Sequence, residues 1–187
     1  LLQRYRDTRA QSLAFCEPLA NEDYGLQAED FTSPPKWHLA HTTWFFETFV
    51  LKAHLPDYAP FQSGFEYLFN SYYYSVGDMF RRPQRGLLSR PTVLEVMDYR
   101  AFVDQQMLAL IEQHQGDPKF IFLVLLGLNH EQQHQELILT DIKHALSLNP
   151  LKPAYRDDME LHDPPGSQMT FNEFEGGITR IGAEGSC

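Results

Sequence analysis

Two histidines four positions apart, His130 and His134, are the residues of this chain best suited to chemistry. Positions i and i+4 of a helix lie on one face, so two imidazoles at this spacing can bind one metal ion. A second segment with strong helical character holds His38 and His41. We therefore predict a metal site that a residue of this second helix completes. A third imidazole would give a three-histidine site, and a carboxylate such as Glu47 would give the two-histidine, one-carboxylate site of non-haem iron. The spacing alone does not choose among these ligands.

The helix around His130 and His134 is expected to turn both rings toward the interior. Its inward stripe would consist of Leu123, Gly127, His130, His134, Leu137 and Asp141. Burying imidazoles costs free energy unless both ring nitrogens find partners, and a metal ion with nearby carboxylates or amides supplies such partners. The local candidates for those carboxylates and amides are Glu131, Gln132, Gln133 and Glu136.

Residues 130–134, His-Glu-Gln-Gln-His, also match the zinc-peptidase signature, in which the glutamate acts as general base. The extended form of that signature needs glycine and histidine where this chain has Leu137 and Thr140. The alternative third ligand, a glutamate on a following helix, would fall in a proline-rich stretch whose only candidate is Glu160. The peptidase interpretation is therefore the weakest of those considered.

Charge and composition exclude several classes of partner. The formal net charge is −10, so neither nucleic acid nor an anionic membrane surface is an expected partner. The longest apolar run, residues 120–128, is too short to span a bilayer. Cys16 and Cys187 lie near opposite ends without the spacing of a disulfide framework, and we expect a cytoplasmic protein.

Four segments carry the sequence signals of helices. Ser33, followed by two prolines, is typical of an N-cap and first turn for the helix that holds His41. Thr92 and Glu95 form a capping box, and Asp117 followed by proline repeats the N-cap signal. These signals predict helices over residues 1–19, 33–54, 92–115 and 117–148.

A long connection, residues 55–91, joins the second and third predicted helices and indicates an all-α, four-helix bundle with one long crossover. It contains a tyrosine run, 72–74, and then a cluster of arginines: Arg81, Arg82, Arg85 and Arg90. Arginine is suited to bidentate binding of a carboxylate. The segment is thus either a solvated loop or the binding site of a small anionic substrate.

The character of the chain changes after residue 150. Residues 151–170 are rich in proline and predict a linker. Residues 171–187 alternate in a β-prone pattern with glycines at turns. We expect residues 1–150 to form the helical domain and residues 171–187 to be the truncated start of a second domain.

The chain resembles the amino-terminal, DinB-like domain of ergothioneine-biosynthesis sulfoxide synthases. The resemblance covers about residues 1–150 and is carried, in order, by residues 37–41 (Trp-His-Leu-Ala-His), 72–73 (Tyr-Tyr), 85–92 (Arg-Gly-Leu-Leu-Ser-Arg-Pro-Thr) and 130–136 (His-Glu-Gln-Gln-His-Gln-Glu). Residues 174–177 (Phe-Glu-Gly-Gly) and 181–182 (Ile-Gly) resemble the start of that family's second domain, which is similar to formylglycine-generating enzyme (sulfatase-modifying factor).

The resemblance implies a mononuclear non-haem iron(II) site whose ligands, by motif position, are His41, His130 and His134; a purified sample could also carry zinc or nickel. It implies O2-dependent joining of a thiol, γ-glutamylcysteine or cysteine, to the imidazole of trimethylhistidine, which gives a sulfoxide. Arg82 and Arg85 are the residues it assigns to the carboxylates of the thiol. A close relative uses unmethylated histidine, so the acceptor stays open.

In the family the second domain docks on the bundle and contributes a catalytic tyrosine, so this chain is expected to bind metal without turning over. The rival interpretation is a stand-alone DinB-like metalloprotein or thiol transferase, which would tolerate zinc or nickel and need no O2. A third is a helical module whose histidines only stabilise the core.

Overall fold

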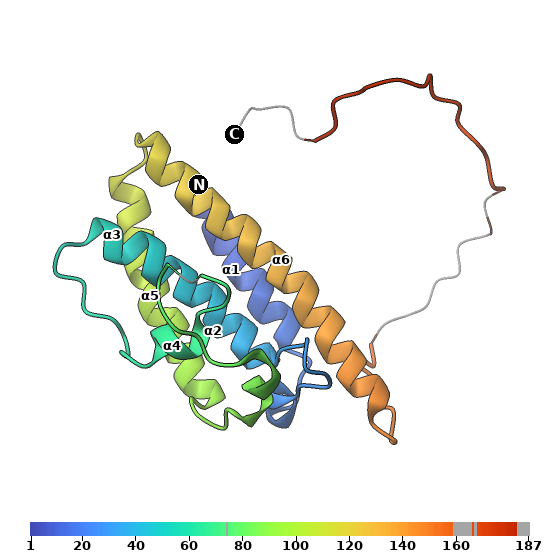
Figure 1. Ribbon diagram of the computed structural model, residues 1–187, viewed down its shortest axis with the longest axis horizontal. Coiled ribbons are helices and arrows are strands. Elements are labelled where there is room, and N and C mark those ends of the chain that lie inside the picture. The colour runs from blue at the N-terminus through green and yellow to red at the C-terminus, as the bar shows by residue number, and fades with distance from the viewer. Residues whose placement is uncertain (74, 159–165, 167, 183–187) are drawn as a thin grey trace. The chain divides into compact units, whose positions relative to one another are not determined.

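Four principal helices lie side by side in residues 1–157 of the computed structural model (Figure 1). They are α1 (Leu2–Cys16), α2 (Pro35–Phe45), α5 (Val93–Gln113) and α6 (Pro118–Leu148). The structure describes residues 1–73, 75–158, 166 and 168–182, and helices are the only regular elements among these residues. The predicted all-α bundle is confirmed.

The sequence signals at the starts of the last two helices are confirmed. The Thr92 hydroxyl accepts a hydrogen bond from the Glu95 backbone N–H at 3.2 Å, and the Glu95 carboxylate accepts one from the Thr92 backbone N–H at 2.7 Å. The Asp117 carboxylate accepts from the Lys119 N–H at 2.9 Å. These bonds satisfy backbone donors that have no partner inside the first helical turn.

The start of α2 differs from the prediction. The N-cap is Pro34 and the first helical residue is Pro35, so Ser33 does not cap the helix. Its hydroxyl instead accepts a hydrogen bond from Arg85 Nη1 at 2.9 Å. A side chain from the long connection thus uses the group that the sequence pattern assigned to the helix start.

The chain around the principal helices consists of short elements, which are η1 (Asn21–Gly25), η2 (Phe46–Leu51), α3 (Lys52–His54), α4 (Phe65–Phe69) and η3 (Arg82–Leu87). The π-helical η2 and then α3 continue α2 to residue 54, the end that the sequence predicts. In the long connection, α4 packs against α2, and the Trp37 indole N–H donates to the Leu68 carbonyl at 3.0 Å. The connection is therefore a structured cover over α2.

The buried stripe of α6 lies one position away from the predicted one. It consists of Phe120, Val124, Gly127, Leu128, Glu131, Gln135, Ile138, Ile142 and Leu146. Of the predicted stripe only Gly127 is buried, whereas His130 and His134 are half-buried. The predicted stripe does not include Glu131 and Gln135, but hydrogen bonds to other helices allow both to enter the core.

Gly127 allows α6 to approach the helix that carries His41. A Cβ atom at this position would lie 2.6 Å from Cε1 of Phe46 and 2.9 Å from Cε1 of Phe45. Real Cβ atoms do not approach ring carbons this closely, so any larger residue would force α6 and η2 apart. Gly127 thus leaves room for the neighbouring helix.

Residues 158–187 form a separate unit. Its described residues have neither helix nor strand, and Phe171, Phe174 and Ile178 are exposed. The β-prone alternation does not produce a strand there, because a strand needs a partner for its backbone groups. Glu160, Cys187 and the rest of residues 183–187 lie outside the described residues, as does Tyr74.

A bilayer-spanning helix is not found in the described part of the chain, since no helix there is both long enough and apolar enough.

Candidate metal centre

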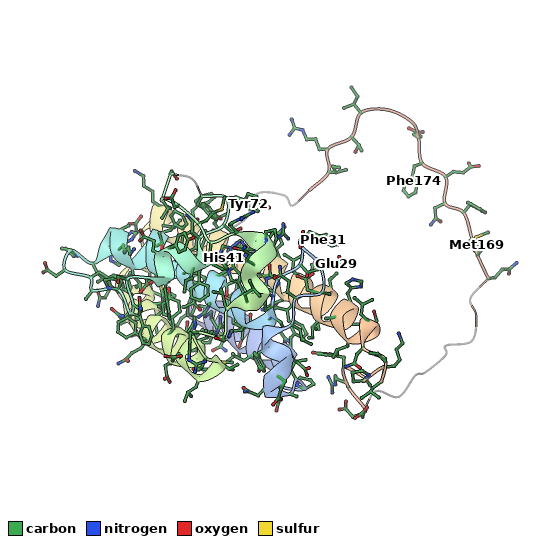
Figure 2. All side chains as sticks on the ribbon, turned by 60° about the horizontal axis from the view of Figure 1, so that its bottom comes forward. Glu29, Phe31, His41, Tyr72, Met169 and Phe174 are labelled. Atoms are coloured by element: carbon green, nitrogen blue, oxygen red, sulfur yellow. The ribbon has the colours of Figure 1, made fainter. Side chains whose placement is uncertain are left out.

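Three imidazole rings from two helices meet inside the helical unit, where Figure 2 labels His41. His41 comes from α2, and His130 and His134 come from α6. One ring nitrogen of each lies within 4.8 Å of the other two, and the Nε2 atoms of His41 and His130 are 3.2 Å apart. Two nitrogens bound to one ion at about 2.0–2.1 Å lie about 2.8–3.4 Å apart for bond angles between a right angle and a tetrahedral angle. The spacing therefore suits two ligands of one ion.

The second nitrogen of each ring has a different environment. His41 Nδ1 donates a hydrogen bond to the Phe69 carbonyl at 2.6 Å, and His134 Nδ1 lies 2.8 Å from His38 Nδ1. His130 Nδ1 is buried and has no hydrogen-bond partner. For His41 and His134 the nitrogen left free is Nε2, which is the atom available to a metal ion.

Both alternative third ligands are engaged elsewhere. His38 Nε2 lies 3.2 Å from Asp141 Oδ2. The Glu47 carboxylate is buried and accepts hydrogen bonds from the hydroxyls of Tyr58 and Tyr99 at 2.7 and 2.6 Å. Among the described residues, the group that geometry brings together for a metal ion is His41, His130 and His134.

Burial keeps the three imidazoles neutral. Together with the charge of neighbouring histidines, it lowers the pKa of His41 and His134 well below the usual 6.5 and that of His130 to about 4, although the carboxylate of Glu131 partly opposes the shift of His130. Neutral imidazole is the form that binds metal, so these rings need not lose a proton at neutral pH before binding.

Aromatic rings hold the candidate ligands in place. His41 is stacked between Trp37 and Trp44, with ring centroids 4.6 and 5.5 Å away and interplanar angles of 13° and 15°. Phe45 packs against His130 at 5.0 Å. This packing restricts the rotation of the rings, which favours a preformed site.

Arg85 lies in the same cavity as the three histidines. The cavity has a volume of about 340 Å³, and the Arg85 guanidinium stacks 3.4 Å above the Trp37 ring. It donates to the hydroxyls of Ser33 and Ser71 at 2.9 Å each, and its Nε atom has no partner. Among the described residues no carboxylate pairs with it. Burial, and then the charge of Arg82, lowers its pKa to about 9. The cavity thus holds a buried cation without a counter-charge.

Arg82 lines the cavity as well, with its Nη1 atom 3.1 Å from the Tyr72 hydroxyl, and Figure 2 shows Tyr72 at the edge of the helical unit. The structure therefore brings both predicted arginines to the side of the histidines. Arg81 and Arg90, from the same cluster, are exposed and do not line this cavity.

A sequence model of the DinB superfamily matches residues 4–138, more than half of the chain and all three histidines. The chain belongs to the DinB superfamily. Members of the superfamily are often metal-binding and are often metal-dependent enzymes. No curated protein shows significant sequence similarity to this chain.

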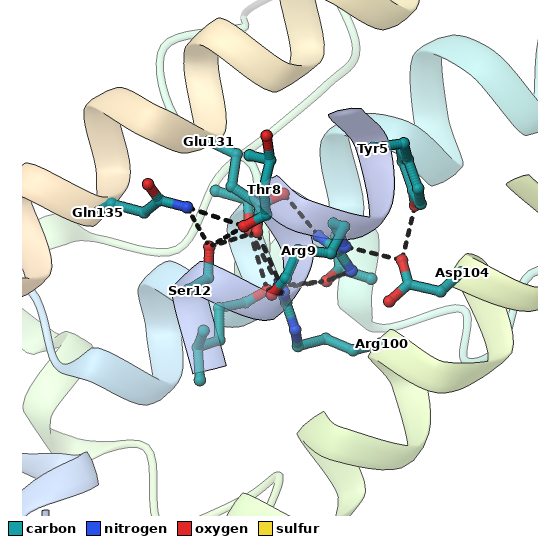
Figure 3. Close-up of polar contacts among 11 residues, drawn as sticks. Tyr5, Thr8, Arg9, Ser12, Arg100, Asp104, Glu131 and Gln135 are labelled. Atoms are coloured by element: carbon teal, nitrogen blue, oxygen red, sulfur yellow. Dashed lines mark hydrogen bonds and ion pairs between the residues drawn. The ribbon is translucent and has the colours of Figure 1, made fainter. Parts of the chain in front are cut away.

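The neighbouring face of α6 in this DinB domain carries a buried ionic network (Figure 3). Glu131 accepts from Arg9 Nη1 at 2.9 Å, from Arg100 Nη2 at 3.0 Å and from the Ser12 hydroxyl at 2.7 Å. Arg9 also pairs with Asp104 at 2.7 Å. Burial alone would raise the Glu131 pKa, but the two arginines hold it at about 2.

This network corrects two expectations. Glu131 is not a hydrogen-bond partner of the histidines, because both of its carboxylate oxygens bind groups on other helices. It is also not a general base of a zinc peptidase, since it is fully buried on the other face of α6. Gln132 and Glu136 are exposed, and only Gln133 among the predicted partners lines the cavity.

Sequence reasoning gave no role to several residues around the DinB site. Asp141 was placed only on the inward stripe, although it follows His134 by two helical turns on one face and so had a detectable signal. Ser33 was assigned to a cap, and Ser71 was not singled out. The contact of His41 with the Phe69 carbonyl involves backbone, so no side-chain pattern could have found it.

Proposed function

We propose that this chain provides the metal-binding part of an oxygen-dependent, non-haem iron(II) sulfoxide synthase. A cysteine-containing thiol, γ-glutamylcysteine or cysteine, would be joined to the imidazole carbon of trimethylhistidine. The thiol hydrogen and the imidazole hydrogen leave with one oxygen atom as water, and the other oxygen atom becomes the sulfoxide. The thiol and the imidazole together supply the electrons that reduce O2. The observation that carries the proposal is a three-imidazole site and an unpaired buried arginine in one cavity.

The donor set supports a metal that needs open positions. Three neutral imidazoles from His41, His130 and His134 suit iron as well as zinc, copper or nickel, and three protein ligands leave further positions for other ligands. When bound, iron(II) supplies the redox chemistry that activation of O2 requires. The protein contributes the fixed orientation of the rings.

Arg85 supports a substrate with a carboxylate. A buried charge is costly unless it is paired, and among the described residues the Arg85 guanidinium contacts two serine hydroxyls and the Trp37 ring but no carboxylate. Its free Nε–H makes it a suitable donor to a planar carboxylate. Arg82, at the same cavity, would bind a second carboxylate of γ-glutamylcysteine.

The test of this proposal is the titration of γ-glutamylcysteine into the Co(II)-loaded chain, read from the sulfur-to-cobalt charge-transfer band. Arg85→Ala is expected to weaken binding about 10–100-fold, because charge-assisted hydrogen bonds are lost, and to leave the metal stoichiometry unchanged. 2-Mercaptoethanol, which has no carboxylate, should bind both proteins equally. The matched control is Arg81→Ala, an exposed arginine of the same segment. Equal binding of γ-glutamylcysteine to the wild type and to Arg85→Ala would contradict the substrate assignment.

The segment after the bundle completes the proposal. We assign residues 151–170 to a linker and residues 171–187 to the beginning of the second domain, which would dock on the bundle and complete the active site. With that domain supplied, O2 consumption should require both the thiol and trimethylhistidine. A thiol transfer that proceeds without O2 and with zinc or nickel would instead favour the stand-alone DinB-like metalloprotein.

A further inference from the structure

A chain of hydrogen-bonding groups leads from the start of α2 to one of the candidate ligands. The Ser33 backbone N–H donates to Asp141 Oδ2 at 2.8 Å, and the same oxygen lies 3.2 Å from His38 Nε2. His38 Nδ1 then lies 2.8 Å from His134 Nδ1. The side chains of His38 and Asp141 are only 2% and 11% exposed, so water competes little for these contacts.

The chemistry of the groups fixes the direction of each hydrogen bond. A carboxylate only accepts, so His38 Nε2 carries the proton that is donated to Asp141. A neutral imidazole has one N–H, so His38 Nδ1 is an acceptor. His134 Nδ1 must then be the donor, and the lone pair of His134 is left on Nε2.

We propose that His38 and Asp141 are positioning residues that hold His134 in the tautomer and orientation needed for metal binding through Nε2. The proposal rests on the proposed metal site and adds to it. Hydrogen-bonded carboxylates and carbonyls on the far nitrogen of a histidine ligand are a general means of fixing its tautomer. Here the carboxylate acts through a second histidine.

The same contacts exclude His38 as a ligand beside His134. The Nδ1 atoms of the two rings are 2.8 Å apart, and because His38 Nδ1 accepts the hydrogen bond from His134, it has no free lone pair for a metal ion. The other nitrogen of His38 faces Asp141. His38 therefore supports a ligand and is not one itself.

The three candidate ligands are consequently held to different degrees. His41 is fixed by the Phe69 carbonyl and His134 by His38, whereas His130 Nδ1 has no hydrogen-bond partner. Removal of the His38 contact should make His134 resemble His130, with its tautomer no longer fixed.

The experiment is a Co(II) titration of the wild-type chain, Asp141→Asn and His38→Ala, with circular dichroism to show that each protein is folded. Both variants are expected to bind one Co(II) with an affinity about 10–100-fold lower than that of the wild type. Glu136→Gln is the matched control, because Glu136 is an exposed acidic residue of the same helix. It should bind Co(II) like the wild type.

Proton NMR of the Co(II) form supplies a readout that a merely structural role would not move. The wild type should show two slowly exchanging, paramagnetically shifted Nδ1–H signals, one from His41 and one from His134. In His38→Ala the His134 signal should exchange rapidly while the His41 signal persists. Unchanged affinity and both protected signals in His38→Ala would overturn the positioning role while the metal site stood. A wild-type chain that binds no Co(II) would overturn the metal site itself.

Discussion

The two faces of α6 bury polar groups in opposite ways. On one face Glu131 is matched by Arg9 and Arg100, and Arg9 is matched again by Asp104. On the other face Arg85 has no counter-charge among the described residues. Next to it, three neutral imidazoles point toward one another with no carboxylate among them.

The difference distinguishes residues that stabilise the fold from residues that are available to bind a ligand. Buried charges are tolerated when they are paired, and the Glu131 network satisfies this condition within the protein. Arg85 has no such partner among the described residues, and the three neutral imidazoles carry no charge that needs one. A sequence motif that spans both faces, His-Glu-Gln-Gln-His, therefore contains one residue of the ionic network and two of the candidate metal ligands.

The largest expected effect comes from breaking the paired face. Glu131→Gln should lower the free energy of unfolding by about 3–5 kcal/mol, because it leaves Arg100 without its carboxylate and Arg9 with only Asp104. Urea denaturation at neutral pH measures the change. Metal stoichiometry of the folded protein should remain that of the wild type. Glu136→Gln, at an exposed position, should change stability little. A stable Glu131→Gln protein would show that the network is not structural.

Removal of a candidate ligand from the histidine face should affect metal binding strongly and stability only slightly. His134→Ala is expected to abolish tight metal binding, because one of only three protein ligands is removed, and to change the unfolding free energy of the metal-free protein by about 1 kcal/mol. Metal analysis after desalting, combined with denaturation in a chelator, tests both parts. Retention of metal by His134→Ala at the wild-type stoichiometry would contradict the ligand assignment.

The pH dependence of stability also distinguishes the two faces. The folded-state pKa of His130 is about 4 against an ordinary 6.5, so the unfolded chain takes up the proton first and the metal-free protein loses stability as pH falls from about 6.5 to 4. The Glu131 pKa is about 2 against 4.5, so its contribution is complete above 4.5 and is lost as pH falls toward 2.

Each unit of difference between the folded and unfolded pKa is worth about 1.4 kcal/mol. Denaturation of the metal-free chain across the pH range 4–8 should therefore show a slope that His130→Gln reduces and Glu136→Gln does not. A slope that is the same in all three proteins would contradict the assignment to His130.

The sequence predicted those features that depend on local chemistry. Thr92 with Glu95 and Asp117 with proline specify helix starts through contacts a few residues apart, and the i, i+4 spacing placed His130 beside His134. These predictions needed no knowledge of the fold.

The rest depends on contacts between distant segments. The buried stripe of α6 was predicted one position away, because Glu131 is charged and enters the core only with Arg9 and Arg100 from α1 and α5. The cap assigned to Ser33 failed because Arg85, from the long connection, takes its hydroxyl. None of these three arginines can be identified from the residues that surround Glu131 or Ser33 in the sequence.

The central claim is tested most directly by an anaerobic Fe(II) titration of this chain beside His41→Ala and beside His144→Ala, whose side chain is 41% exposed on the same helix as His134. Iron is counted after desalting. One iron per chain in the wild type and in His144→Ala, with none in His41→Ala, is the predicted result. Equal iron in His41→Ala and the wild type, or none retained by the wild type, would contradict a three-histidine site built across two helices.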